Sequence, residues 1–228
     1  METYELKVIA LIHTDLPEKF GLPRQSGLIP ELRGRIVFEP EYRSVDAVRG
    51  VEGYSHLWLI WQFSKAVRDT WSPLVRPPRL GGNEKMGVFA TRSPFRPNAI
   101  GLSSVELEKV ELDRELGPVI YVRGVDLMDG TPIFDIKPYL TYADSHPDAV
   151  GGWTDVVERK YLQVECREEL LEKVHPAQHK ALLAVLANDP RPRYQDDPQR
   201  IYGLTFAQWN VKFRVEGETL HVTEVEAL

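Results

Sequence analysis

Charged and aromatic side chains are concentrated in a short proline-rich segment near the middle of the chain, which reads Arg92-Ser93-Pro94-Phe95-Arg96-Pro97-Asn98. Pro94 and Pro97 each remove a backbone donor and push the preceding residue toward extended geometry, so this segment is predicted to be a stiff loop. Guanidinium groups held on a rigid turn suit planar, bidentate binding of a carboxylate or a phosphate. A surface connection with solvated arginines is the alternative interpretation.

A second pair of residues that could do chemistry is Asp135 and Lys137, in the sequence DIKPYL. On a strand, residues two positions apart lie on the same side. The carboxylate could therefore hold a proton while the ammonium group neutralises a nearby negative charge. The same spacing is equally consistent with a simple surface salt bridge.

Two segments have the composition of RNA contacts, although the net charge of −6 argues mildly against indiscriminate nucleic-acid binding. Between residues 76 and 96 the only acid is Glu84, and the basic residues are Arg76, Arg79, Lys85, Arg92 and Arg96. Further along, Arg191, Arg193 and Tyr194 follow a predicted helix, and a tyrosine beside arginines could stack on an unpaired base. A solvated face and a helix-terminating loop are the respective alternatives.

Other kinds of site find little support. His175 and His179 have the spacing of a helical zinc pair, but no third ligand is evident and no metal site is predicted. Cys166 is the only cysteine, which excludes an internal disulfide and a cysteine-based zinc site. No serine lies in a GxSxG motif, and no GxGxxG follows a strand, so neither an esterase nor a Rossmann-type methyltransferase is indicated.

These candidate residues are positioned by predicted strands rather than helices. Strands are expected at residues 4–13, 35–38, 55–63, 102–112, 118–126 and 131–137, with a further strand starting at Val88 and a short helical turn at 41–48. The run 55–63 is so apolar that it is expected to be buried on both faces. Residues 71–85 are expected to form a long irregular loop. Several hairpin-linked strands with few helices indicate a closed or nearly closed β-barrel.

The C-terminal part has a different pattern. After a polar region at 143–152, helices are predicted at 168–174 and 176–187, followed by strands at 204–215 and 219–225. The expected fold is therefore mainly β, with a single-sheet barrel domain at residues 1–150 and a smaller α+β domain at 151–228. The composition, 43% hydrophobic and 27% charged, and the lack of a signal-like N-terminus are typical of a cytoplasmic protein without membrane segments.

Long motifs along the chain resemble a known family. ATRSPFRPN followed by IGLSSVEL, together with SHLWLIWQF, RPPRLGGN, DLMDGTP and DIKPYL, is similar to the signature of the TsaA-like (TrmO) family of tRNA methyltransferases. The resemblance extends over essentially the whole chain. It implies a non-Rossmann β-barrel that works as a homodimer and transfers a methyl group from S-adenosyl-L-methionine to a tRNA. The implied target is the exocyclic nitrogen of threonylcarbamoyladenosine at position 37, beside the anticodon.

The resemblance also implies site residues by matching motifs. Cofactor contacts are expected from Gln25, Ser26, Gly27, Ser64, Lys65, Arg92, Leu102, Gly124, Val125, Asp126 and Leu127. Ser64 and Lys65 lie in a stretch without a distinctive motif. The hypothesis for catalysis is that Asp135 takes the proton of the target nitrogen while Lys137 or Arg96 neutralises the threonyl carboxylate. The anticodon loop of the tRNA is expected to contact Arg76, Arg79, Arg191, Arg193 and Tyr194.

Two other hypotheses remain open on the sequence. A barrel of this kind could bind tRNA or an adenosyl ligand without chemistry, because Arg92 and the proline-rich loop would serve binding equally well. A hydrolase acting on a modified nucleoside is the third possibility, although no nucleophile or metal set supports it.

Overall fold

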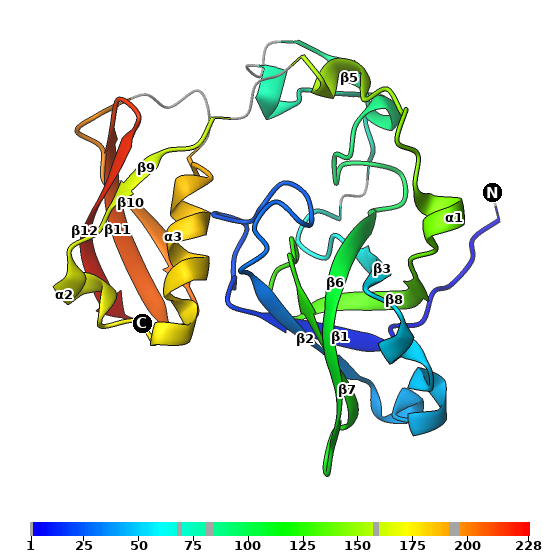
Figure 1. Ribbon diagram of the computed structural model, residues 1–228. Coiled ribbons are helices and arrows are strands. Elements are labelled where there is room, and N and C mark those ends of the chain that lie inside the picture. The colour runs from blue at the N-terminus through cyan, green and yellow to red at the C-terminus, as the bar shows by residue number, and fades with distance from the viewer. Residues whose placement is uncertain (1, 68–69, 81–83, 157–159, 192–196) are drawn as a thin grey trace.

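The protein is described by a computed structural model covering residues 2–67, 70–80, 84–156, 160–191 and 197–228. Its N-terminal part is a closed barrel of six antiparallel strands in the order β1-β2-β7-β6-β3-β8 (Figure 1). The barrel strands are β1 (Ala10–Thr14), β2 (Arg33–Phe38), β3 (His56–Gln62), β6 (Ile100–Asp113), β7 (Gly117–Arg123) and β8 (Thr131–Pro138). The predicted single-sheet barrel is thus confirmed.

The barrel interior follows from alternation along the strands. In β3, Leu57, Leu59 and Trp61 point inward and are at most 7% exposed, whereas Trp58 and Ile60 are only partly buried. The prediction that this strand is buried on both faces was therefore wrong. Its outer side carries apolar residues that no neighbouring layer fully covers.

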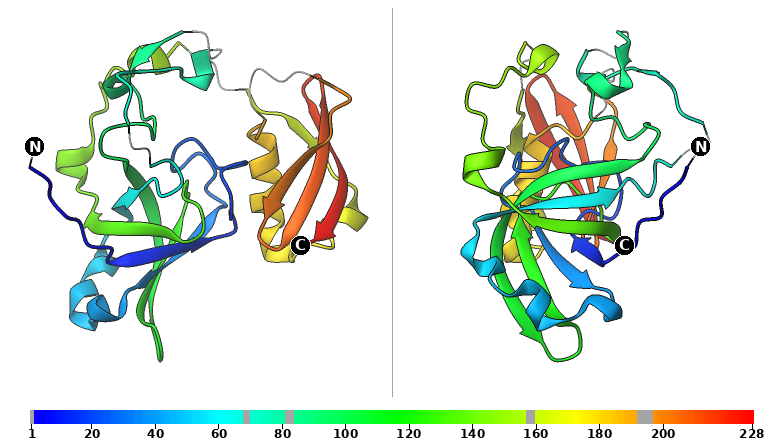
Figure 2. Two further views of the ribbon diagram at one scale, coloured as in Figure 1. Left: turned by 180° about the vertical axis from the view of Figure 1, so that it is seen from behind. Right: turned by 90° about the vertical axis from the view of Figure 1, so that its right-hand side faces the viewer.

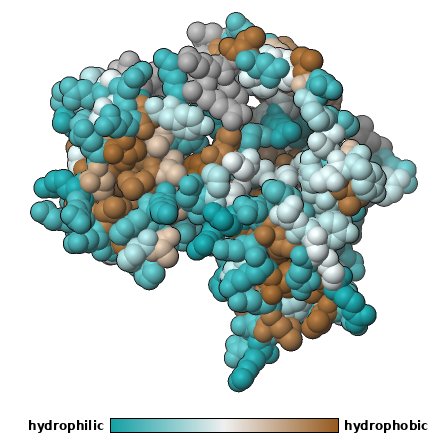
Figure 3. All heavy atoms as spheres, in the orientation of Figure 1, coloured by the Kyte–Doolittle hydropathy of each residue, from teal (hydrophilic) through white to brown (hydrophobic). Residues whose placement is uncertain are grey.

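Short turns connect the barrel strands. The Asp129-Gly130 turn predicted from its sequence leads into β8, with Gly130 at a φ of 69°. The β6–β7 hairpin closes where Asp113 Oδ1 accepts the N–H groups of Glu115 and Leu116. This hairpin projects beyond the barrel, and its tip is hydrophilic (Figure 3). The expected helical turn at 41–48 is formed by the 3-10 turns Pro40–Tyr42 and Val45–Val48, followed by Val51–Gly53.

The connection between β3 and β6 is more regular than predicted. It contains a two-stranded hairpin, β4 (Leu74–Val75) with β5 (Met86–Gly87), and 3-10 turns at Pro78–Leu80 and Val88–Ala90. The strand expected from Val88 is therefore not formed, and this prediction was wrong. The Val88 N–H donates to Pro73 O, and the chain turns there to enter the proline-rich loop. β-Branched residues favour strands only where a partner strand extends alongside them.

A second unit lies beside the barrel (Figure 2). Its sheet has the order β10-β11-β12-β9, and α3 lies between that sheet and the barrel. The elements are α1 (Thr141–Asp144) and the turn Gly152–Thr154 in the connection, then β9 (Gln163–Glu165), α2 (Glu168–Leu171), the turn Pro176–Gln178, α3 (His179–Ala187), β10 (Tyr202–Phe206), β11 (Trp209–Glu216) and β12 (Thr219–Ala227).

The predicted strand at 204–215 is in fact two strands. The chain reverses at Ala207, which adopts a φ of 51° and donates its N–H to Asp15 O at 2.6 Å. Neither glycine nor proline marks this turn, and a left-handed alanine is uncommon. A contact with the barrel thus accompanies a reversal that local sequence does not signal.

The two units share one continuous apolar core. The segment after β1 enters the C-terminal unit, where the Phe20 ring stacks on Phe213 at 6.5 Å between centroids. Gly21 lies so close to Leu204 that an added Cβ would be 2.3 Å from its Cδ1. Gln178 also donates to Asp15 Oδ1 at 2.8 Å, and burial raises the pKa of Asp15 above its usual value. The C-terminal unit is therefore packed firmly against the segment that leads to Gln25.

Candidate functional site

Three connections meet at one end of the barrel. β1, β3 and β7 end there, and β2, β6 and β8 begin there, because all neighbours are antiparallel. The connections are residues 15–32, 63–99 and 124–130. Most of the predicted cofactor residues lie on these connections, so the fold collects residues that are far apart in sequence.

The backbones of two connections touch at a pair of glycines. Gly27 N–H donates to Gly124 O at 2.8 Å, and Gly124 N–H donates to Leu32 O at 2.8 Å. Both glycines have positive φ, 76° and 70°. A Cβ on Gly124 would lie 3.2 Å from Gly27 Cα, whereas one on Gly27 would meet nothing within 4 Å. Gly124 thus allows the close approach, and Gly27 presents bare backbone to open space.

Asp126 is the acidic member of this cluster. Its Oδ1 accepts a hydrogen bond from Ser103 Oγ at 2.6 Å, and its carboxylate also accepts the Ser26 N–H. Burial raises the pKa of Asp126 to about 6, while Ser103, the Ser26 N–H and the Arg92 guanidinium act in the opposite direction. A partly exposed carboxylate with such a pKa, next to a cation, is a physical mark of a functional site.

The proline-rich loop aims its two arginines differently. Side-chain hydrogen bonds brace its start, with Ser93 N–H donating to Thr91 Oγ1 at 3.2 Å. Arg96 donates to Thr91 O at 3.3 Å, so it supports the loop itself. Arg92 is exposed and donates to Gln25 Oε1 across the barrel end. Arg92 is therefore part of the cluster, and Arg96 serves to shape the loop.

The remaining cofactor candidates divide into two groups. Ser64 and Lys65 follow β3 at the same barrel end, and Lys65 O accepts Lys19 Nζ at 2.5 Å. Val125 and Leu127 are fully buried in this structure, so neither presents its side chain to a ligand. Leu102 lies elsewhere: it is 52% exposed on the outer side of β6, opposite the face that carries Ser103.

The proposed catalytic pair lies on that outer side as well. Register places Asp135 beside Ile60 and Ile60 beside Leu102, which forms a row across β8, β3 and β6. Asp135 Oδ2 pairs with Lys137 Nζ at 2.8 Å. The structure thus brings Asp135 and Lys137 together with Leu102, and brings Arg92 and Asp126 together at the barrel end.

Sequence reasoning missed two polar residues that join this site. Ser103 is 1% exposed and Trp61 is 7% exposed, and Trp61 Nε1 donates to Ser103 Oγ at 2.9 Å. A small polar residue at an inward position of an alternating strand was the available signal. Its partners could not be read from the sequence, since they depend on strand register.

The candidate tRNA contacts are only partly described. Arg76 is exposed on the β4–β5 hairpin. Arg193, Tyr194 and the side chain of Arg79 lie outside the described residues. Arg191 is 9% exposed and pairs with Asp189 at 2.8 Å, so its guanidinium is held inside the C-terminal unit.

Other side chains with chemical potential are engaged structurally. Burial raises the pKa of Cys166, which favours the unreactive thiol form. His175 Nδ1 accepts the Ala177 N–H, and His179 Nε2 bonds to Val174 O. In the described part of the chain no group of three or more potential metal-binding side chains occurs, and no helix there has the length and apolarity needed to span a membrane.

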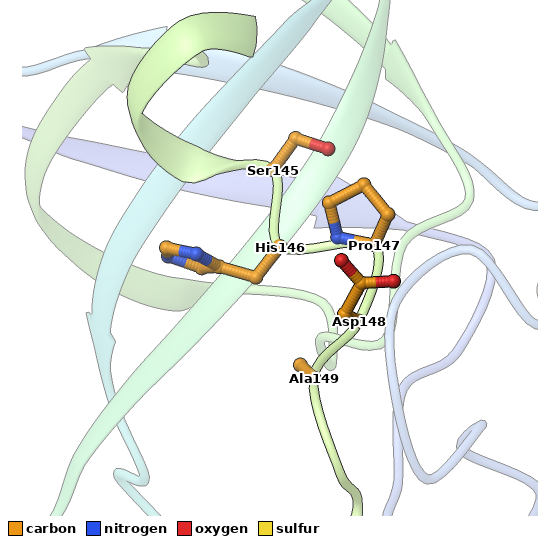
Figure 4. A pocket seen from close by; sticks show the side chains of 5 residues that line it. All are labelled: Ser145, His146, Pro147, Asp148 and Ala149. Atoms are coloured by element: carbon orange, nitrogen blue, oxygen red, sulfur yellow. The ribbon is translucent and has the colours of Figure 1, made fainter.

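Two surface hollows among the described residues lie away from the cluster. One is lined by Ser145, His146, Pro147, Asp148 and Ala149, all from a single connection (Figure 4). Another is lined by residues 164–167 and 221–222 of the C-terminal unit, where His221 pairs with Glu165 at 2.9 Å. Neither includes a predicted site residue. The cluster at the barrel end is thus defined by its converging polar groups.

The chain is similar to known proteins along nearly its whole length. Residues 11–145 match the tRNA-methyltransferase O N-terminal domain, and residues 159–228 match the TrmO C-terminal domain. The tRNA (adenine(37)-N6)-methyltransferase of Escherichia coli (strain K12) is 40% identical over 236 residues, which cover 99% of each chain. A putative S-adenosylmethionine-dependent methyltransferase of Pseudomonas aeruginosa is 41% identical, covering 89% of this chain and 88% of the other. The crystal structure of TrmO from Pseudomonas aeruginosa superposes with a TM-score of 0.80 at 32% identity, covering 99% of this chain and all of the other.

Proposed function

This chain belongs to the tRNA-methyltransferase O family, and we infer from that membership that it is an S-adenosylmethionine-dependent tRNA (adenine-N6)-methyltransferase acting on adenosine 37. We propose further that its substrate base is threonylcarbamoyladenosine, methylated on the exocyclic nitrogen. The barrel, residues 1–150, is the proposed catalytic domain, and residues 151–228 form a C-terminal domain that supports it. The single observation that carries the proposal is the cluster at the barrel end.

The residues of this cluster fit an S-adenosylmethionine molecule. Such a ligand has a cationic sulfonium, an ammonium group and a carboxylate. The cluster offers a carboxylate at Asp126, a guanidinium at Arg92 and a side-chain amide at Gln25, around the bare backbone of Gly27. When bound, the cofactor supplies a methyl group that is already reactive. The protein therefore has mainly to bind and align its two ligands.

Proton removal is the one step that needs a protein group. The carbamoyl carbonyl withdraws electrons from the target nitrogen, which makes its proton more acidic and its lone pair poorer. We assign proton acceptance to Asp135, and neutralisation of the threonyl carboxylate to Lys137. Both side chains are open to a ligand, and Asp135 lies in the same row across β8, β3 and β6 as Leu102, which is one of the expected cofactor contacts. Arg96 is a weaker candidate for charge neutralisation, because its guanidinium braces the loop carbonyls.

The β4–β5 hairpin is the proposed contact for the anticodon loop. Trp71 is 52% exposed and Phe89 is 74% exposed, with their ring centroids 6.2 Å apart. Arg76 and Lys85 flank the paired residues of the hairpin and are both exposed. Exposed aromatic rings and exposed basic side chains on one hairpin segment suit unstacked bases and their phosphates. The chain then leads directly into the loop that carries Arg92.

A homodimer and a cytoplasmic location complete the proposal. The outer side of β3 and β6 exposes Leu102 and Ile100, 52% and 38%, beside Ile60. An apolar surface of this kind is suited to a second copy of the chain.

The experiment that tests the function is mass spectrometry of nucleosides from tRNA incubated with the protein and S-adenosylmethionine. We expect threonylcarbamoyladenosine to gain one methyl group, and unmodified adenosine 37 to gain none. With Asp135→Asn the rate should fall by about 100-fold, as for loss of a general base, while Glu106→Gln on the same outer side serves as the control. A methyl group on unmodified adenosine alone would overturn the choice of substrate, and full turnover by Asp135→Asn would remove Asp135 from the mechanism.

The hairpin contact predicts a selective loss of tRNA binding. Replacing Trp71 with alanine removes one exposed ring without opening the barrel core. The KM for tRNA should rise by about tenfold, since stacking of one base contributes roughly 1–3 kcal/mol, and the affinity for S-adenosylmethionine should stay unchanged. Steady-state kinetics with varied tRNA measures the KM, and calorimetric titration with S-adenosylmethionine measures the cofactor affinity separately. Val67→Ala, also an exposed apolar residue, is the control.

A binding module without catalysis is the second candidate function, and Arg92 with its rigid loop would serve it too. It would bind S-adenosylmethionine and tRNA in the same assays but give no methylated nucleoside.

A further inference from the structure

A buried hydroxyl group links the barrel interior to the cofactor cluster. Ser103 lies on the inner face of β6 between Gly101 and Val105 and is 1% exposed. Burying a hydroxyl without hydrogen-bond partners costs free energy, so the partners of this hydroxyl indicate its role. Ser103 Oγ donates to Asp126 Oδ1 at 2.6 Å and accepts from Trp61 Nε1 at 2.9 Å.

We call the two hydrogen bonds from Trp61 to Ser103 and from Ser103 to Asp126 the relay, and the donor and acceptor in each are fixed by the chemical groups present. An indole N–H can only donate, so Trp61 occupies a lone pair of the Ser103 oxygen. The single hydroxyl proton of Ser103 is then left for Asp126. A contact of 2.6 Å is within the range of hydrogen bonds to an ionised carboxylate. The relay therefore favours the ionised form of Asp126 in one orientation.

Gly101 explains why Trp61 holds its position. The two residues are direct partners in the β3–β6 register. A Cβ on Gly101 would lie 2.2 Å from Trp61 Cε2, so the indole lies across this strand only because no side chain is there. The Trp61 ring also packs against Phe63 at 4.3 Å between centroids. The donor of the relay is thus fixed by packing on two sides.

The other end of the relay reaches the loop that we assign to the cofactor. The Asp126 carboxylate accepts the Ser26 N–H, and the Arg92 guanidinium that attracts it also contacts Gln25. We propose that Ser103, oriented by Trp61, is a positioning residue that fixes the Asp126 carboxylate and thereby holds the loop from Gln25 to Gly27 closed on the cofactor site. This inference rests on the proposed function in taking that site for S-adenosylmethionine.

A pH dependence follows from the groups around Asp126. Burial raises the pKa of Asp126 to about 6, and the Ser103 hydrogen bond lowers it. Arg92 is a charged group that acts on this carboxyl, and it also lowers the pKa. Ionised Asp126 holds the loop and attracts a cationic ligand, so affinity should rise as pH increases through about 6 and then level off. Removing the Ser103 hydroxyl raises the pKa of Asp126, which moves this transition to higher pH.

The test is calorimetric titration of the full-length protein with S-adenosylmethionine between pH 5 and pH 8. In Ser103→Ala we expect the transition to move up by about one pH unit, with affinity about fivefold weaker at its wild-type midpoint, because the ionised fraction of Asp126 there falls from about one half to about one tenth. Trp61→Phe keeps an aromatic ring but removes the donor, and should move the transition less, in the same direction. Asp126→Asn should abolish the transition, which assigns it to this carboxyl rather than to another group of the barrel end, such as Asp15.

The same variants give a readout without cofactor. The Asp126 carboxyl carbon, followed by NMR during a pH titration, should titrate at a higher pH in Ser103→Ala than in the wild type. An unmoved midpoint in both titrations overturns the inference, even if affinity falls equally at every pH, because that pattern means a purely structural role. If the protein methylates no tRNA while the NMR midpoint still moves, the proposed function fails and the positioning of Asp126 by Ser103 stands.

Discussion

Gly101→Ala is expected to lower the free energy of unfolding by about 3 kcal/mol or more, an unusually large effect for a single added methyl group. The new Cβ would lie 2.2 Å, 2.4 Å and 2.6 Å from three atoms of the Trp61 indole. The indole cannot move outward easily, since Trp61 is 7% exposed and packed against Phe63. Overpacking costs about 1–3 kcal/mol, and breaking the Trp61–Ser103 hydrogen bond leaves buried polar groups unpaired at a cost of about 1–3 kcal/mol more.

Urea unfolding of the wild type and the variant measures this loss. Gly53→Ala is the matched control, because a Cβ at that position meets nothing within 4 Å. We expect Gly53→Ala to stay within about 0.5 kcal/mol of the wild type. The double variant Gly101→Ala with Trp61→Leu should recover part of the loss, since the smaller side chain leaves room. Equal stability of Gly101→Ala and Gly53→Ala would contradict the packing argument and, with it, the fixed orientation of Trp61.

The barrel was predictable because its strands obey local rules. Alternating inward residues, the Asp129-Gly130 turn and the hairpin at Asp113 each follow from short-range pattern and turn chemistry. The predictions failed where contact with a residue distant in sequence determines the backbone conformation. Ala207 reverses the chain in contact with Asp15, and Val88 turns in contact with Pro73. No periodicity within either segment contains that information.

The candidate site shows the same division. Pro94 and Pro97 correctly predicted an irregular loop, but only the structure distinguishes Arg92, which reaches Gln25, from Arg96, which braces Thr91. Ser103 could be recognised as a polar residue at an inward position. That its hydroxyl connects Trp61 to Asp126 depends on the pairing of β3 with β6 and on the return of the chain after β7.

The second large effect is expected from Phe213→Ala in the C-terminal sheet. Phe213 is fully buried, with its ring stacked on Tyr202 at 5.4 Å and on Phe20 at 6.5 Å. Truncating a buried phenylalanine costs about 3–5 kcal/mol. The loss of stability alone would say nothing of function. Phe20, however, lies on the segment that leads from β1 into the Gln25 loop, so this variant also loosens one anchor of the cofactor site.

We therefore expect Phe213→Ala to weaken S-adenosylmethionine affinity as well as folding, under conditions where the variant remains folded. Leu220→Ala is the matched control: Leu220 is fully buried in the same sheet, where its register partners are Val215 on β11 and Val164 on β9, whereas Phe213 stacks directly on Phe20. Both variants should unfold at lower urea concentration, and only Phe213→Ala should bind the cofactor several-fold more weakly in calorimetry. If both weaken binding equally, general destabilisation explains the loss. If neither does, the C-terminal unit does not anchor the loop, and its contribution lies in tRNA binding or assembly instead.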